Sequence, residues 1–130
     1  VFSRETLQGI FMSHPTAEII VGRDANTNLG YRTRLRVTLR GKKKFLLAVQ
    51  RSLLQHEVDS IFYKRESKHR PRPVLRITGI KNLRKFIDVF HSDISNIDWN
   101  SFSETLSIVE SKKHLTAQGF DKILSMKGVL

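Results

Sequence analysis

The sequence has 130 residues and a mass of 15.0 kDa, which is enough for one domain, residues 1–130, with its own hydrophobic core. It contains no cysteine, which excludes disulfides and thiolate zinc sites, and no apolar run approaches the ~18 residues that a membrane span requires. The formal charge of +11 and the pI of about 10.5 favour a polyanionic partner.

The positive charge is concentrated in one part of the chain. Residues 32–85 contain 17 lysine and arginine residues against 3 acidic ones, whereas the other residues together carry a net charge of −3. A charge needed only for solubility would be spread out, so this concentration favours a nucleic-acid-binding surface. The lack of cysteine favours an intracellular protein. Because the sequence begins with Val1 rather than methionine, it gives no information on targeting signals.

The first thirty residues predict a helix, a strand and a loop. Residues 3–13 have apolar side chains at helical spacing, with Ser3 as the N-cap and Pro15 as the stop. Residues 17–23 predict a strand because β-branched side chains occupy their centre. Residues 24–30 are rich in turn-forming residues and lead into the next strand, which predicts a hairpin.

Residues 32–40 are the segment on which the functional interpretation depends. They alternate polar and apolar residues over nine positions, which is the period of a half-buried β-strand. Four guanidiniums at alternating positions repel one another, so an extended polyanion is a natural partner, with an ordinary solvated sheet face as the alternative. The predicted inward residues are Thr33, Leu35, Val37 and Leu39, and the predicted outward residues are Arg32, Arg34, Arg36, Thr38 and Arg40.

A helix and a second hairpin are predicted next. Residues 42–54 form a helix with Phe45, Leu46, Val49 and Leu53 on one face, and the lysines at its start oppose the helix dipole, which suggests a role outside the helix. Strands are predicted at residues 59–66 and 73–79, joined by a cationic tip at 67–72. Phe62 is expected to face the core, while Tyr63, Arg65, Arg76 and Thr78 are expected to face outward.

Three further helices complete the prediction, at residues 82–91, 101–114 and 116–126, with Thr116 as the N-cap of the last. The buried stripe of the first of them is expected to contain Leu83, Phe86, Ile87 and Phe90. The predicted fold class is therefore α+β, with the order αββαββα, a curved four-stranded antiparallel sheet backed by helices, and a C-terminal helix.

This order resembles the LAGLIDADG homing endonuclease family over the whole chain. The residues that carry the resemblance are Leu7-Gln8-Gly9-Ile10-Phe11, the LRITG strand that continues into residues 81–87, and the KKHLT..G…I segment at residues 112–124. The resemblance implies that the sheet lies in a DNA major groove. It also implies that the first helix, through Gly9 and Ser13, packs against a second copy of the chain or a second similar domain.

The motif departs from the family pattern at both of its acid positions, and the second of them is the one that holds the divalent metal in active members. Met12 and His14 stand where active members have acids, and residues 97–102 lack the accessory lysine of the family. Mg²⁺ prefers carboxylate oxygen ligands, so we expect no cofactor and no cleavage. Mg²⁺ would be a cofactor only if the protein is an active endonuclease. Glu18 is the nearest acid that could take over the lost role.

The sequence therefore predicts a nucleic-acid-binding descendant of this family without cleavage activity. It would act on DNA or structured RNA, as a maturase, a regulator or a ribosomal or other ribonucleoprotein component, in an organelle, an archaeon or a bacterium. An active, homodimeric, metal-dependent DNA endonuclease and a module for an acidic protein partner are the alternatives. The predicted nucleic-acid-binding residues are Arg32, Arg34, Arg36, Arg40, Lys42, Lys43, Tyr63, Arg65, Lys68, Arg70, Arg72 and Arg76.

Overall fold

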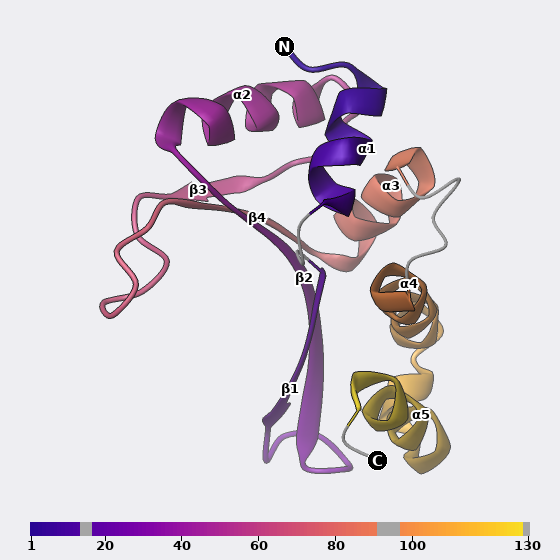
Figure 1. Cartoon of the computed structure of the whole chain (residues 1–130). Coiled ribbons are helices and arrows are strands. Elements are labelled where there is room, and N and C mark those ends of the chain that lie inside the picture. The colour runs from indigo at the N-terminus through magenta and orange to yellow at the C-terminus, as the bar shows by residue number, and fades with distance from the viewer. Residues whose placement is uncertain (14–16, 91–96, 129–130) are drawn as a thin grey trace. The chain divides into compact units, whose positions relative to one another are not determined.

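A computed structural model describes residues 1–13, 17–90 and 97–128 (Figure 1). The four strands form one sheet with the order β1-β2-β4-β3, and β4 runs antiparallel to both of its neighbours. The predicted α+β fold, its element order and its four-stranded sheet are thereby confirmed. The elements are α1 (Arg4–Met12), β1 (Ala17–Arg23), β2 (Tyr31–Arg40), α2 (Lys43–Leu54), β3 (Ile61–Tyr63), β4 (Val74–Thr78), α3 (Ile80–Phe90), α4 (Ile97–Glu110), the 3-10 helix η1 (Lys113–Leu115) and α5 (Ala117–Lys127).

The chain divides into two compact units. Unit 1 comprises Val1–Thr16 and Arg36–Asp93, and unit 2 comprises Ala17–Leu35 and Ile94–Leu130. Strand β2 belongs to both, because its first half lies in unit 2 and its second half in unit 1. Within the ranges that the structure describes, no helix is both long enough and apolar enough to cross a membrane.

The core of unit 1 is built from aromatic and aliphatic side chains of its three helices. Helix α1 begins where Ser3 Oγ accepts a hydrogen bond from the Thr6 amide, as its N-cap position predicts. Its buried Phe11 meets Phe86 of α3 edge-on, with ring centroids 5.0 Å apart, and Phe86 in turn lies 5.2 Å from Phe90. The predicted stripe of α3 is confirmed in full, because all four of its residues are buried.

Polar contacts tie the helices of unit 1 to the segments that precede α1 and β3. The buried Ser52 hydroxyl of α2 accepts from the Phe2 amide at 2.8 Å and donates to the Ala48 carbonyl at 2.8 Å. The Asn82 side chain of α3 accepts from the Asp59 amide at 2.9 Å and donates to the Asp59 carbonyl at 2.6 Å. These bonds satisfy buried or loop backbone groups, and they fix the segment that leads into β3.

Unit 2 has its own smaller core. Trp99 and Phe102 of α4 pack edge-on at 5.6 Å, and Tyr31 at the start of β2 stacks on Phe120 of α5 at 5.4 Å. Thr116 caps α5 by accepting from the Gly119 amide, as predicted. A Cβ added at Gly119 would lie 1.9 Å from the Lys113 carbonyl oxygen, so the glycine of the KKHLT..G segment is required by this close backbone approach.

Several predicted boundaries were wrong. Strand β3 has three residues instead of the eight predicted at 59–66, because the chain after Tyr63 turns into the tip of the hairpin. Helix α4 begins at Ile97 and ends at Glu110, and the residues expected to extend it form η1, which follows Lys112 in the left-handed region at φ 61°. Phe45, expected on the buried face of α2, is half-buried.

Candidate nucleic-acid interface

The register of the strands in unit 1 decides which side chains share a face. Directly paired residues of an antiparallel ladder point to the same side, and neighbours along a strand alternate. The pairs Val37–Ile77 and Leu39–Leu75 therefore lie on the core face, where Phe62 pairs with Leu75. We call the opposite side the polar face, and its residues are Arg36, Thr38 and Arg40 of β2, Ile61 and Tyr63 of β3, and Val74, Arg76 and Thr78 of β4.

Arg76 lies at the centre of the polar face. It pairs with Thr38 on one side and with Ile61 on the other, and its Cζ lies 5.4 Å from the centre of the Tyr63 ring. A guanidinium over a tyrosine ring is attracted to the ring and restricted in direction. The outward orientation predicted for Arg76, Thr78 and Tyr63 and the inward orientation of Phe62 agree with this register.

Thr38 corrects the predicted pattern of exposure. It lies on the polar face as expected, but it is 1% exposed, because a short side chain directly opposite the long Arg76 is shielded from solvent. Among the residues that the structure describes, Thr38 Oγ1, Ser60 Oγ and Arg76 Nε are buried without a hydrogen-bond partner. Ser60 and Arg76 also line a cavity of about 160 Å³ together with Asp59. Two of these buried atoms, Thr38 Oγ1 and Arg76 Nε, belong to residues of the polar face.

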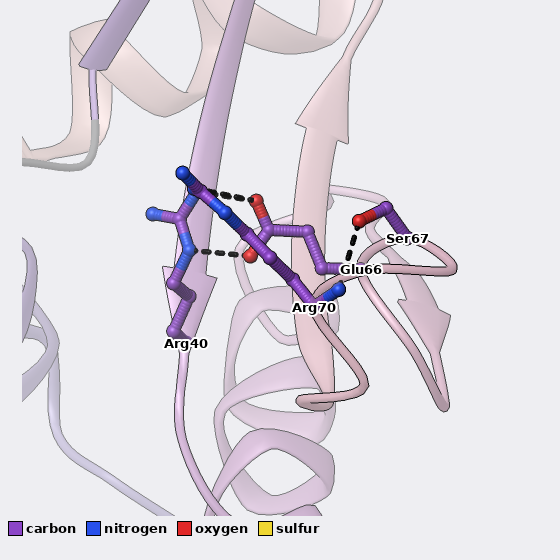
Figure 2. A network of polar contacts seen from close by, with 4 residues as sticks. All are labelled: Arg40, Glu66, Ser67 and Arg70. Atoms are coloured by element: carbon purple, nitrogen blue, oxygen red, sulfur yellow. Dashed lines mark hydrogen bonds and ion pairs between the residues drawn. The ribbon is translucent and has the colours of Figure 1, made fainter.

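Arg40, at the end of β2, is held by an acid that the sequence analysis did not single out. Its Nε and Nη2 donate to the two carboxylate oxygens of Glu66, each at 2.7 Å (Figure 2). Arg70 Nη1 lies 3.9 Å from the same carboxylate. The hydrogen bond from Arg40, aided by the charges of Arg40, Arg70 and Arg76, lowers the pKa of Glu66 from 4.5 to about 2, against the opposing effect of burial.

The tip of the second hairpin carries a cluster of exposed cations in unit 1. Backbone bonds between Ser67 and Arg70 and from the Glu66 amide to the Arg72 carbonyl close the turn, and Ser67 Oγ accepts from the Arg70 amide at 3.1 Å (Figure 2). The Arg70 side chain is 71% exposed. The predicted binding residues that are exposed in and beside this tip are Arg65, Lys68, Arg70 and Arg72, and Lys42 and Lys43 are exposed at the start of α2.

Arg32 and Arg34 lie in the half of β2 that belongs to unit 2. Both are exposed, and Arg32 extends along β1 to within ordinary contact distance of Gly22, where an added Cβ would lie 3.8 Å from Arg32 Nε. The predicted alternation of this half is seen in the burial of Leu35 and the exposure of Arg34. The twelve predicted residues are therefore distributed over two units, ten of them in unit 1.

The described end of α1, up to Ser13, offers no carboxylate for Mg²⁺. Met12 offers a thioether, and the Ser13 hydroxyl donates to the Ile10 carbonyl at 3.1 Å. His14, at the motif position of the second acid, lies outside the described residues. The described part of this turn thus lacks the carboxylate oxygens that Mg²⁺ prefers, so the donor set does not fit this ion. Gly9 is exposed, and a Cβ added there would meet nothing within 4 Å.

Glu18 lies on β1 in unit 2. It is half-buried and lines a cavity of about 370 Å³ together with Ser101, Met126 and Lys127. Lys127 Nζ donates to the carbonyl of the neighbouring Ile19 at 2.7 Å. Over the ranges that the structure describes, no three His, Cys, Asp or Glu side chains gather closely enough to hold a metal ion.

Comparisons with known proteins identify the fold. No protein-family model and no curated protein matches the sequence. The homing endonuclease I-TnaI matches with a TM-score of 0.80 and 22% identity, over 97% of this chain and 85% of its own. I-SmaMI, bound to an uncleaved DNA target in the presence of calcium ions, matches with 0.80 and 18%, over 97% and 44% of the two chains. The LAGLIDADG meganuclease I-CpaMI, bound to uncleaved DNA, matches with 0.77 and 20%, over 98% and 43%.

At these sequence identities, the matches show the fold of the chain but not its activity or its ligands. The chain spans most of I-TnaI but less than half of I-SmaMI and I-CpaMI. The resemblance of fold predicted from the sequence is confirmed over nearly the whole chain.

Proposed function

We propose that this chain, which has the fold of LAGLIDADG homing endonucleases, binds nucleic acid through the polar face of unit 1 and the adjoining hairpin tip. The observation that carries the proposal is the placement of Arg76 and Tyr63 on one face of the sheet. The exposed cations of residues 64–72 continue from the end of β3. DNA is bound in the solved structures of I-SmaMI and I-CpaMI, which share this fold.

The chemistry of the polar face suits a phosphate backbone and base edges. Arginine is the side chain best suited to bidentate contacts with phosphate and with the O6 and N7 atoms of guanine. Tyr63, which is 40% exposed, offers a ring that can contact a sugar or a base. Lysine and arginine at the exposed hairpin tip provide contacts that position the protein without reading sequence.

Binding measured against salt tests this proposal. Six to eight phosphate contacts on duplex DNA predict a slope of log K against log salt of roughly −5 to −7. Fluorescence anisotropy with a labelled duplex at several salt concentrations gives this slope. A slope near zero would contradict the proposal and favour an acidic protein partner.

DNA and RNA are both candidates within this proposal. A basic sheet face can hold phosphates of either polymer, and A-form RNA is contacted through its loops and minor groove. A maturase, a regulator and a ribosomal or other ribonucleoprotein component would all use RNA or DNA in this way. Competition between a DNA duplex and an RNA hairpin at one salt concentration, together with the nucleic acid that co-purifies, distinguishes them.

Loss of cleavage is the second part of the proposal. The described end of α1 offers no carboxylate, so nothing there would hold the metal ion that activates water for phosphodiester hydrolysis. We therefore expect no nicking of supercoiled or linear DNA with Mg²⁺ or Mn²⁺. Nicking that disappears in Glu18→Ala would contradict this expectation and support the alternative, an active homodimeric endonuclease, which the endonuclease structures of the same fold favour.

We also propose that α1 contacts a second copy of the chain or a second similar domain. Gly9 is exposed in the interior of α1, where glycine costs about 1 kcal/mol relative to alanine, and the packing of this chain does not require it. Gly9→Leu should therefore leave the monomer folded and weaken self-association in sedimentation equilibrium. An unchanged association constant would contradict a contact through Gly9.

A further inference from the structure

Glu66 is an acidic residue in a strongly basic part of the sequence. It is the sole acidic residue between Asp59 and Asp88, a stretch that contains nine lysine and arginine residues. Its side chain is 9% exposed, whereas the residues on both sides of it, Arg65 and Ser67, are exposed. A carboxylate that is withdrawn from solvent within a cationic hairpin needs a partner, and Arg40 provides it.

The contact between Glu66 and Arg40 has the geometry of a bound oxyanion. Two nitrogens of one guanidinium donate to two oxygens of one carboxylate, each at 2.7 Å (Figure 2). This two-point contact is also how arginine binds phosphate, so one guanidinium edge cannot serve both partners at once. With its pKa lowered to about 2, Glu66 remains ionised at any pH at which nucleic acid would bind.

Glu66 also lies beside the tip. Its second oxygen lies 3.9 Å from Arg70 Nη1, and its amide donates to the Arg72 carbonyl at 2.8 Å, so the carboxylate lies at the base of the closed turn. The side chain of Arg70 is attracted to this base while its 71% exposure leaves it accessible. One acid thus contacts a strand cation and a tip cation from different parts of unit 1.

We propose that Glu66 acts as an internal counterpart of phosphate, which withholds Arg40 from nucleic acid and directs Arg70. It is a positioning residue that sets how many cations unit 1 presents to a polyanion. This inference rests on the proposed nucleic-acid binding. It removes Arg40 from the direct contacts predicted from the sequence and gives that arginine a structural role.

The neutral, equally sized variant Glu66→Gln provides the first test. It removes one negative charge and releases Arg40 for phosphate, so the salt slope on duplex DNA should become steeper by about 0.9. Affinity for DNA of arbitrary sequence should rise about threefold to tenfold at moderate salt. An unchanged or shallower slope in Glu66→Gln would contradict the inference.

Arginine variants provide matched comparisons. Arg40→Gln in the otherwise unchanged protein should leave the salt slope within about 0.3 of its original value, whereas Arg72→Gln in the exposed tip should make it shallower by about 0.9. The double variant Glu66→Gln with Arg40→Gln should lose the gain seen in Glu66→Gln alone. A slope that Arg40→Gln reduces as much as Arg72→Gln does would show that Arg40 already contacts phosphate, which overturns the inference.

The unsubstituted protein gives a test that does not depend on the folding of any variant. In an NMR titration with the duplex, the Nε–Hε signal of Arg40 should stay in place, while that of Arg76 should move. Movement of the Arg40 signal by a similar amount would overturn the inference. Failure of the unsubstituted protein to bind the duplex with a steep salt slope would instead contradict the proposed function, so the two failures are distinguishable.

Discussion

The two faces of the β2–β4 ladder in unit 1 consist of alternating residues from the same strands, and they differ in what they contact. On the core face, Val37, Leu39, Leu75 and Ile77 are each at most 1% exposed. On the polar face, the neighbours of these residues include arginines whose guanidiniums lie against a tyrosine ring or a carboxylate. Because successive side chains point to opposite sides, stability and binding can be altered separately on one strand.

The polar face itself contains two kinds of arginine. Arg40 donates to both carboxylate oxygens of Glu66 through Nε and Nη2. Arg76 instead lies over the Tyr63 ring, beside buried polar atoms that lack hydrogen-bond partners among the described residues. An arginine with a carboxylate partner contributes to the fold, and an arginine on an aromatic ring can still donate hydrogen bonds to a phosphate. Residue type and strand position do not distinguish these two roles, but the contact partner does.

The largest expected effect comes from the core face. Leu39→Ala removes a side chain that is 1% exposed and should lower the free energy of unfolding by about 3 kcal/mol. Leu54→Ala on α2, where the leucine is 54% exposed, is the matched control and should change it by less than about 0.5 kcal/mol. Urea unfolding measures both free energies, and similar losses in the two variants would contradict the assignment of Leu39 to the core face.

A smaller effect is expected on the polar face. Arg76→Gln should weaken binding to duplex DNA about threefold to tenfold and make the salt slope shallower by about 0.9, because one phosphate contact is lost. Arg51→Gln, an exposed arginine in the last turn of α2, is the control and should leave affinity and slope unchanged. Equal losses in both variants would mean that overall charge, rather than the polar face, governs binding.

The smallest effect concerns pH and the pair of Arg40 and Glu66. The pKa of Glu66 is lowered from 4.5 to about 2, so its stabilising contribution is complete above about pH 4.5 and is lost as the pH falls towards 2. The unfolding free energy should therefore fall more steeply in the unsubstituted protein than in Glu66→Gln over this window. Urea unfolding as a function of pH measures the difference, and parallel curves would show that the pair does not stabilise the fold.

Much of the fold followed from local patterns in the sequence. The alternation at 32–40 and the helical spacing of Leu83, Phe86 and Ile87 predicted β2 and α3, because burial of one face follows from side-chain periodicity. The length of β3 was overestimated because residues 64–66 continue a strand-like stretch of sequence, whereas in the structure Glu66 contacts Arg40 and Arg72. Helix α4 begins at Ile97, four residues before the predicted start, although Asn96, a residue type that favours the N-cap, directly precedes it in the sequence.

Less of the candidate site than of the fold could be predicted from the sequence. The directions of Arg76 and Tyr63 followed from alternation, but their contact depends on the register between β3 and β4, which a single sequence does not give. Glu66 was not recognised because the pairing partner, Arg40, lies 26 residues away. Its only signal in the sequence is its isolation, as a single acid among many cations. The burial of Thr38 likewise depends on the cross-strand neighbour.

Protection of individual arginines from chemical modification tests the central claim most directly. The protein is treated with a glyoxal reagent with and without duplex DNA, and each modified arginine is quantified by mass spectrometry. The exposed Arg65 and Arg72 beside the polar face should become protected when DNA is bound, while the exposed Arg51 of α2 should react at the same rate. Protection of Arg51 without protection of Arg65 and Arg72 would contradict the assignment of the interface to the polar face and the hairpin tip.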